Sequence, residues 1–253
     1  MAPSPWSWQA AWVELAAVAV LAAAYALVAR RHRPSRARAA CFAGGLVLLV
    51  ALAVSPLGTL ALHYLLTAHL VQNVALAEWI PLLLVAGIPP ALAAELARFR
   101  AVRLLTRPAV ALPLWLGGYA LWHLPAPYDA ALENHALLHL EHLTYLATGV
   151  LLWWPVLQGS PWLLSAGAKS AYLFTAFVFA SPLGLLLALL PSPLYDFYEA
   201  APRLGGLTPL EDQQLAGIAM AVSESIVFFT AFTIFFVRFL AEEDAALEEQ
   251  PDG

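Results

Sequence analysis

Charged residues are scarce in this chain. Lysine, arginine, aspartate and glutamate make up 11% of its 253 residues, whereas 62% of the residues are hydrophobic. Soluble proteins carry roughly 25% charged residues, and a surface this apolar could not be covered in water. We therefore expect an integral membrane protein whose main surroundings are the lipid bilayer. The sequence also lacks the basic face that binds nucleic acid, so we expect no nucleic-acid partner.

Cysteine and lysine each occur once. A single cysteine, Cys41, excludes an internal disulfide and a CxxC redox or thiolate metal site. A retinal-binding protein with seven helices would need a lysine in its last helix, and the one lysine, Lys169, lies elsewhere. The chain also lacks a GxSxG elbow, a P-loop and a dinucleotide-binding fingerprint. We therefore do not expect an enzyme.

Long apolar segments fill most of the sequence. A transmembrane helix needs about 20 mostly apolar residues, and we identify seven candidates. They cover residues 10–28, 39–54, 63–85, 109–122, 135–156, 170–190 and 212–236. The sequence thus predicts an all-α, polytopic transmembrane helix bundle that forms a single domain over residues 1–253. We expect its acidic tail, residues 239–253, to be frayed and cytoplasmic.

The basic residues predict the orientation of this bundle. The first apolar segment has no lysine or arginine before it and five arginines after it, the reverse of a signal peptide. If the N-terminus lies outside, the inner loops 30–38, 92–107 and 157–169 and the C-terminal tail hold eleven of the twelve basic residues. The positive-inside rule then predicts seven helices with the N-terminus outside and the C-terminus inside.

Histidines are concentrated at the predicted outer ends of the helices. Six of the seven lie there, and His135, His139 and His142 share one helical face through their spacing of i, i+4 and i+7. Polar groups within a bilayer normally face the interior of the bundle. We therefore expect the third, fifth and seventh helices to bring His69, His139, His142 and Asp212 to a common centre.

Several imidazoles with a carboxylate form a sound ligand set for copper or zinc. The sequence predicts a metal site at the outer face. Its predicted ligands are His69, His139, His142, His123, Asp212 and Met220. The residues predicted to support these ligands are Gln72, Asn73, Glu141 and Gln213. An alternative stays open, in which the histidines cap helices and bind lipid headgroups.

Two carboxylates, Glu78 and Glu224, lie deeper in the third and seventh predicted helices. Ionisable groups at membrane depth are candidates for function, so these two could form an ion or proton path below the histidines. Alternatively, each carboxyl is protonated and hydrogen-bonded to a neighbour.

Four sequence blocks resemble the CtaG-type cytochrome c oxidase assembly factors of bacteria. The blocks are TAHLVQ at 67–72, WHLPAPYDAAL at 122–132, LHLEHLTYLATGVLLWWPVL at 138–157 and GGLTPLEDQQLAGIAM at 205–220. The resemblance implies a multi-pass protein of the bacterial plasma membrane that helps to deliver copper to a haem–copper oxidase. It also implies an oxidase subunit and other copper chaperones as partners.

The resemblance implies roles for particular positions. The matching residues are His69, Gln72, His123, Asp129, His139, Glu141, His142, Asp212, Gln213, Gln214 and Met220. The chain departs from the family at Asn73, where a second histidine is usual, and at residues 223–225, where Glu224 adds a charge. Two other functions remain open. One is a carrier or channel for copper or protons that uses Glu78 and Glu224. The other is a haem-b protein with two histidines as axial ligands.

Overall fold

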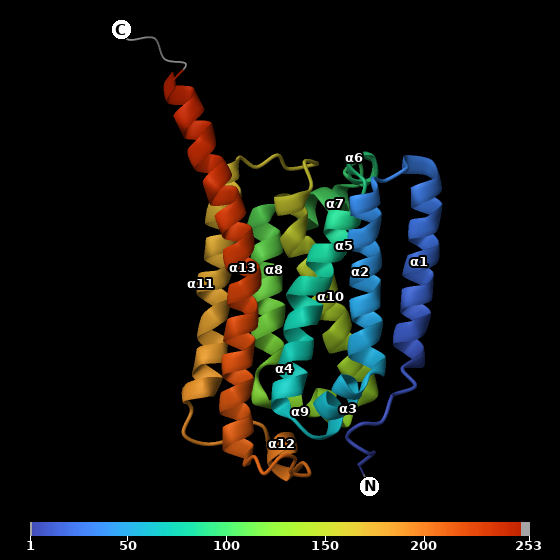
Figure 1. Cartoon of the computed structure of the whole chain (residues 1–253), viewed down its shortest axis with the longest axis vertical. Helices are drawn as coiled ribbons and strands as arrows, with labels where there is room; N and C mark the ends of the chain where they lie inside the picture. The colour runs from blue at the N-terminus through green and yellow to red at the C-terminus, as the bar shows by residue number, and fades with distance from the viewer. Residues whose placement is uncertain (1, 249–253) are drawn as a thin grey trace.

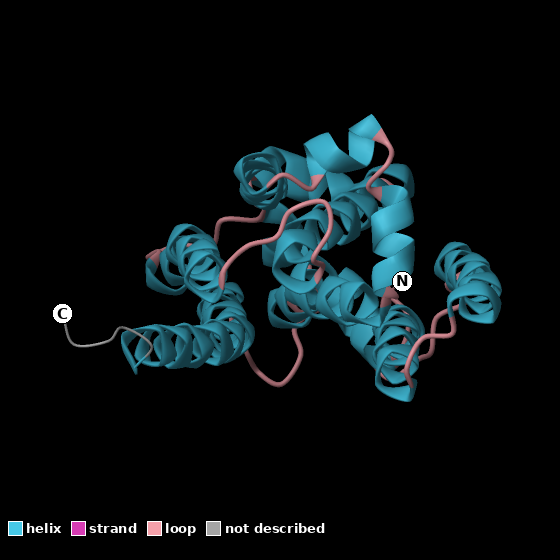
Figure 2. Cartoon of the chain, turned by 90° about the horizontal axis from the view of Figure 1, so that it is seen from above, coloured by secondary structure: helices cyan, strands magenta, loops and turns pink. Residues whose placement is uncertain are grey.

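The computed structural model describes residues 2–248, which form helices and loops and no strand (Figures 1 and 2). The helices are α1 (Trp12–His32), α2 (Arg36–Val54), α3 (Pro56–His63), α4 (Leu66–Val74), the π-helical turn η1 (Ala75–Trp79), α5 (Ile80–Gly87), α6 (Pro90–Leu96), α7 (Arg100–Leu105), α8 (Pro108–Trp122), α9 (Pro125–Glu133), α10 (His135–Leu157), α11 (Ala166–Leu189), α12 (Asp196–Ala200) and α13 (Pro209–Glu248). The segment Leu66–Gly87, which joins α4, η1 and α5, is continuous.

Within the described residues, five helices are long and apolar enough to cross a membrane: α1, α2, the segment Leu66–Gly87, α11 and α13. The other two predicted spans correspond to α8 and α10. Helix α8 has 15 residues, which is short for a span. Helix α10 has 23 residues, but its three histidines and Glu141 make it less apolar. The all-α, multi-pass class is thus supported, whereas the count of seven spans and their orientation stay predictions.

The structure differs from the predicted segments in two places. The third segment was expected to be one helix from residue 63, but α3 ends at His63 and α4 begins at Leu66. The tail from residue 239 was expected to be frayed, but α13 continues to Glu248. Residues 241–248 are alanine, glutamate and leucine with one aspartate, a composition that favours a helix. Residues 249–253 lie outside the described part of the chain.

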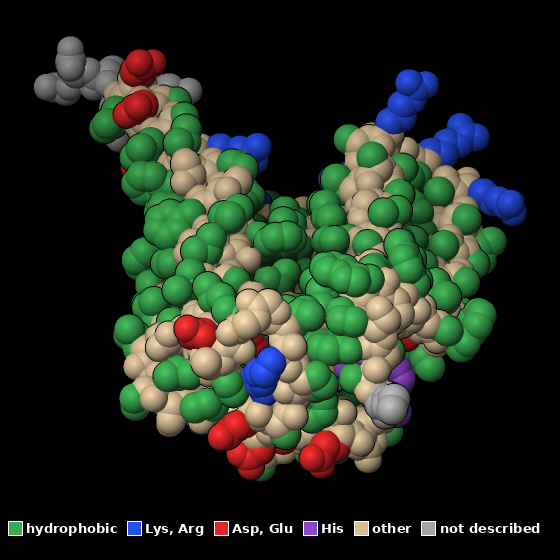
Figure 3. Space-filling view, turned by 60° about the horizontal axis from the view of Figure 1, so that its bottom comes forward, with side chains coloured by type: hydrophobic (Ala, Val, Ile, Leu, Met, Phe, Trp, Pro, Cys, Tyr) green, Lys and Arg blue, Asp and Glu red, His purple; other side chains and the backbone are tan. Residues whose placement is uncertain are grey.

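Most of the basic residues are confined to one end of the bundle. One end carries the N-terminal residues, α3, α9 and α12, and we call it the histidine end (Figure 1). The opposite end carries α6, α7 and the arginine-rich segment 30–38, and we call it the arginine end. Acidic side chains gather at the histidine end and also on the last turns of α13 at the opposite end, and apolar side chains cover much of the surface between the ends (Figure 3). This separation is the pattern on which the predicted orientation rests.

The segment Leu66–Gly87 is the most enclosed of the candidate spans. Its apolar window is 72% buried, and it packs against α2, α10 and α13. Helix α1 is at the other extreme, with no buried residue, and packs mainly on α2. The interior of the bundle is therefore organised around α4, η1 and α5.

Helix α10 meets this segment at Gly149. A Cβ atom at Gly149 would lie 2.3 Å from the carbonyl oxygen of Ala77 and 2.5 Å from Cγ of Pro81. The indole Nε1 of Trp115 donates a hydrogen bond to the same Ala77 oxygen, at 3.2 Å. Only glycine lets the α10 backbone lie this close to the π-helical turn.

We predict that Gly149→Ala destabilises the protein by about 1–3 kcal/mol, because the added methyl group forces α10 away from η1. Gly117→Ala in α8 is the matched control, since nothing lies within 4 Å of a Cβ built there. Thermal unfolding in detergent compares the two variants with the parent. A Gly149→Ala protein that melts no lower than Gly117→Ala would contradict the close contact.

Candidate metal centre

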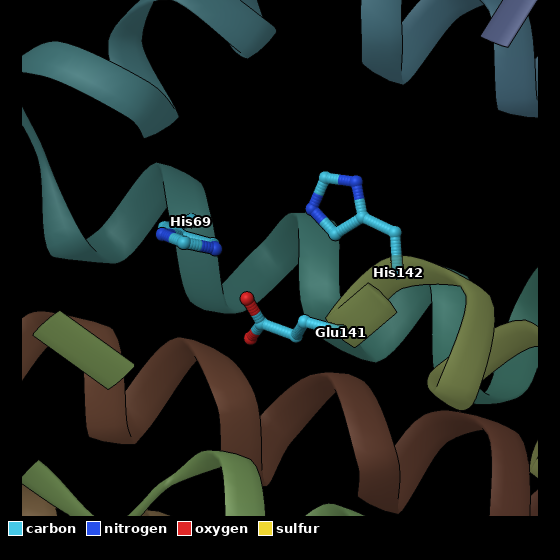
Figure 4. Close-up of side chains that lie close together, drawn as sticks. All are labelled: His69, Glu141 and His142. Carbon is cyan, nitrogen blue, oxygen red and sulfur yellow. The ribbon is translucent and has the colours of Figure 1, made fainter. Parts of the chain in front are cut away.

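His69, Glu141 and His142 converge in the structure. Each offers one ligand atom, and these atoms all lie within 4.8 Å of one another. His69 projects from α4, and Glu141 and His142 project from α10 into the space between the helices (Figure 4). His69 and Glu141 are buried, and His142 is partly buried.

A tyrosine hydroxyl fixes which nitrogen of His69 is free. Nδ1 of His69 lies 2.7 Å from the hydroxyl oxygen of Tyr198. That hydroxyl donates its only hydrogen to the carbonyl oxygen of Ala61, so it must accept from His69, and Nδ1 carries the proton. Nε2 is then an unprotonated, buried nitrogen without a hydrogen-bond partner among the described residues. Its lone pair is available to a cation.

Glu141 and His142 also each keep one potential metal-binding atom without a hydrogen bond. Asn73 donates from Nδ2 to Oε1 of Glu141 at 3.2 Å, while Oε2 of Glu141 and Nε2 of His142 have no hydrogen-bond partner in the described part of the chain. Buried polar atoms are normally paired, and leaving one unpaired costs about 1–3 kcal/mol. A metal ion between the helices would satisfy all three donor atoms at once. The residues present therefore fit a metal ion.

Asp212 lies in the first turn of α13 and holds the start of α4. Its Oδ2 accepts from the backbone N–H of Leu66 at 2.7 Å, and its Oδ1 accepts from the N–H of Thr67 at 3.1 Å. The Thr67 hydroxyl also donates to Oδ1, at 2.7 Å. The carboxylate thus caps α4, whose first N–H groups have no partner within the helix. Both of its oxygens are used, and Asp212 does not join the His69–Glu141–His142 group.

His139 and Met220, which were also predicted as ligands, lie outside the His69–Glu141–His142 group. Nδ1 of His139 lies 3.2 Å from Oε1 of Glu14 in α1. Met220 is buried within the hydrophobic core. Gln213, predicted as a supporting residue, accepts from the N–H of Leu194 at 2.6 Å and donates to the carbonyl oxygens of Leu187 and Ser192. It therefore holds the loop between α11 and α12.

His123 follows the last residue of α8 and lies close to the group without joining it. Its Nδ1 donates to the carbonyl oxygen of Tyr119 at 2.8 Å, and its Nε2 has no partner among the described residues. Burial lowers the pKa of His123 to about 4, so the ring is neutral at pH 7. The ring of Tyr128 lies between the two histidines, with ring centroids 6.1 Å from His123 and 5.2 Å from His69.

Gln72 lies on the same helix as His69 and faces α2. Its Nε2 donates to the carbonyl oxygen of Leu52 at 3.2 Å. Its Oε1 is buried and has no hydrogen-bond partner in the described residues. Gln72 therefore joins α4 to α2, as a supporting residue would.

Glu78 and Glu224 form a separate buried pair. Glu78 lies in the π-helical turn, and both of its oxygens are buried and unpaired among the described residues. The Tyr119 hydroxyl donates to Oε1 of Glu224. The two carboxyl groups are close enough to interact electrostatically. The sequence left open that each carboxyl group is hydrogen-bonded to a neighbour. Glu224 has such a neighbour in Tyr119, and Glu78 has none among the described residues.

Sequence reasoning missed two features of the site. Glu141 was predicted only to support the ligands, whereas it is a full member of the group. Tyr198 was expected only as part of an outer loop long enough to lie over the site, and its contact with His69 was not predicted because it joins residues 129 positions apart. No local spacing signals such a contact. A tyrosine in a polar loop is compatible with many roles.

Comparison with known proteins gives one match. The family model described as cytochrome c oxidase caa3 assembly factor (Caa3_CtaG) matches residues 18–242, nearly nine-tenths of the chain. No curated protein and no solved structure matches the chain. The matched range includes α4, α10 and α13, which carry the group and the residue that caps α4. The chain belongs to the family of cytochrome c oxidase caa3 assembly factors.

Proposed function

We propose that this assembly factor binds a copper ion between His69, Glu141 and His142 and delivers it to a subunit of the haem–copper oxidase. The observation that carries the proposal is the convergence of donor atoms without hydrogen-bond partners from two helices. Two neutral imidazoles and a carboxylate suit copper or zinc. The family supports copper as the cargo, because the assembly of a haem–copper oxidase requires that metal.

The proposal includes the location of the site. With the histidine end outside, the arginine end would face the cytoplasm in agreement with the positive-inside rule. Copper would then be loaded and released at the outer face of the bacterial plasma membrane. A partner oxidase subunit, or another copper chaperone, would meet the protein at this face. The acidic side chains gathered there would attract a cation before it binds (Figure 3).

A double substitution, His69→Ala with His142→Ala, is expected to abolish copper binding by purified protein. Removing two of three ligands should cost more than the roughly 10–100-fold that follows from loss of a supporting partner. Elemental analysis after copper loading measures the loss. His32→Ala is the matched control, because His32 pairs with Glu95 at the arginine end, at 3.7 Å. Equal copper content in the double variant and the parent would disprove this site.

Tyr198→Phe is expected to weaken copper binding by about 10–100-fold, because the acceptor that keeps the proton on Nδ1 of His69 is lost. Competition with a chelator of known affinity gives the dissociation constant. Tyr195→Phe is the control, since the Tyr195 hydroxyl donates to the carbonyl oxygen of His123 instead. The assignment of the His69 tautomer would be wrong if both phenylalanine variants bound copper equally well. Absence of a Soret band in the same samples would separate copper binding from haem binding.

Transport is a second candidate function, which the unpaired Glu78 in a π-helical turn favours. Such turns often occur at functional sites, and ionisable residues at membrane depth often mark ion pathways. Glu224 and Tyr119 would complete a path below the copper site.

Proteoliposomes test this second candidate. Under the leading proposal we expect no copper or proton flux, and Glu78→Gln should leave copper binding unchanged because Glu78 is not a ligand. Flux in the parent that Glu78→Gln removes would establish transport instead. Ser223→Ala, beside Glu224 in sequence, controls for a general disturbance of the membrane interior.

A further inference from the structure

A groove lies between α1 and α10 at the histidine end. Its volume is about 460 Å³. It is lined by residues 9–14 and 17, which lie in α1 or just before it, and by one face of α10. The ends of α2 and α3, Gln72 and Leu76 complete the lining. Most of the lining is leucine, alanine and valine, so polar side chains in it are conspicuous. We call it the α1–α10 groove.

One side chain of the His69–Glu141–His142 group also lines this groove. His142 lines the groove and also belongs to the His69–Glu141–His142 group. Neither His69 nor Glu141 lines it. A cation in the groove would therefore reach the group at His142. Since Nε2 of His142 has no partner among the described residues, no hydrogen bond would have to break first.

A second pair of metal-ligand groups stands beside His142 in the groove. Nδ1 of His139 lies 3.2 Å from Oε1 of Glu14, and their side chains are 38% and 21% exposed. Both residues line the groove, as does His135. The three histidines of α10 lie on one helical face at successive turns. Imidazole and carboxylate are ligands for copper and zinc, so the pair could hold a cation that still keeps part of its water.

Helix α1 is suited to a site that opens and closes. It buries no residue, and its extensive packing is on α2 and not on α10. At the arginine end it is held by the Tyr25 hydroxyl, which donates to the carbonyl oxygen of Gly87 at 3.0 Å, and by the Arg31–Glu95 ion pair. Toward the histidine end, Glu14 contacts His139 of α10, with Oε1 of Glu14 3.2 Å from Nδ1 of His139. A small movement of α1 there would change access to the groove without disturbing the core.

We propose that the α1–α10 groove is the route by which a copper ion enters and leaves the buried group, and that Glu14 and His139 form a transient copper site on that route. The inference rests on the proposed function, because it requires copper at His69, Glu141 and His142. It assigns His139 a role different from that of a resident ligand. The ion would pass from water to Glu14 and His139, then to His142, and would exchange one ligand at a time.

The proposal is tested by the rates of copper loading and release. Stopped-flow spectroscopy on the full chain in detergent measures both rates. We expect Glu14→Gln to slow loading by about tenfold, the lower end of the effect of charge focusing on association rates. His139→Gln should slow loading to a similar extent, because the ion loses a ligand on the route. A residue on the route affects both directions, so release should slow by the same factor and the dissociation constant should not change. Glu133→Gln, which alters an exposed carboxylate that does not line the groove, should load like the parent.

Each other outcome has a definite meaning. Unchanged rates in both variants, with copper bound, would overturn the route and leave the proposed function intact. Faster loading would overturn it too, because the pair would then only hold α1 against α10. A large loss of affinity in His139→Gln would overturn it by making His139 a resident ligand. A parent protein that binds no copper would overturn both the proposed function and the route.

Discussion

The close contact between α10 and the π-helical turn is the constraint on which the candidate site depends. The segment Leu66–Gly87 and α10 both run from the histidine end toward the arginine end (Figure 1). His69 precedes Ala77 by eight residues, and Glu141 and His142 precede Gly149 by eight and seven. At 1.5 Å per residue these offsets place both sets of ligands about 11–12 Å from the contact. Equal offsets on parallel helices therefore bring the three side chains to the same depth.

Polar side chains from distant parts of the chain then fix the orientation of the ligands. Asp212 of α13 caps α4, one turn before His69. Asp129 of α9 accepts hydrogen bonds from the backbone N–H groups of Asp196 and Phe197, at 3.2 and 3.3 Å, and so holds the start of α12. Helix α12 carries Tyr198, which sets the tautomer of His69. The geometry of the His69–Glu141–His142 group thus depends on two carboxylates that lie outside it and accept hydrogen bonds from backbone N–H groups.

The sequence was sufficient to predict where the long apolar helices lie in the chain, but not the short helices or the rotation of any helix. Apolar length identified the candidate spans, and α10 begins at the predicted residue, His135. Spacing placed His135, His139 and His142 on one face, but α10 is apolar on most sides, so nothing local showed which face meets α4. In the structure, Glu141 and His142 point toward His69, whereas His139 points toward Glu14. Asp212 illustrates the same difficulty, because a carboxylate near a metal and a carboxylate at a helix N-terminus have the same sequence signature.

The charge of Glu141 gives a further reason to expect a cation in this group. A buried carboxylate is costly unless it is neutralised, and two neutral imidazoles do not balance its charge. Arg203 is the one basic residue outside the arginine-rich segments 30–38 and 98–107, Lys169 and Arg238. Its guanidinium donates to the carbonyl oxygens of Tyr198 and Glu199, so it serves α12. Under the proposed function, Glu141 would hold a proton in the empty group, and the metal ion would displace that proton when it binds.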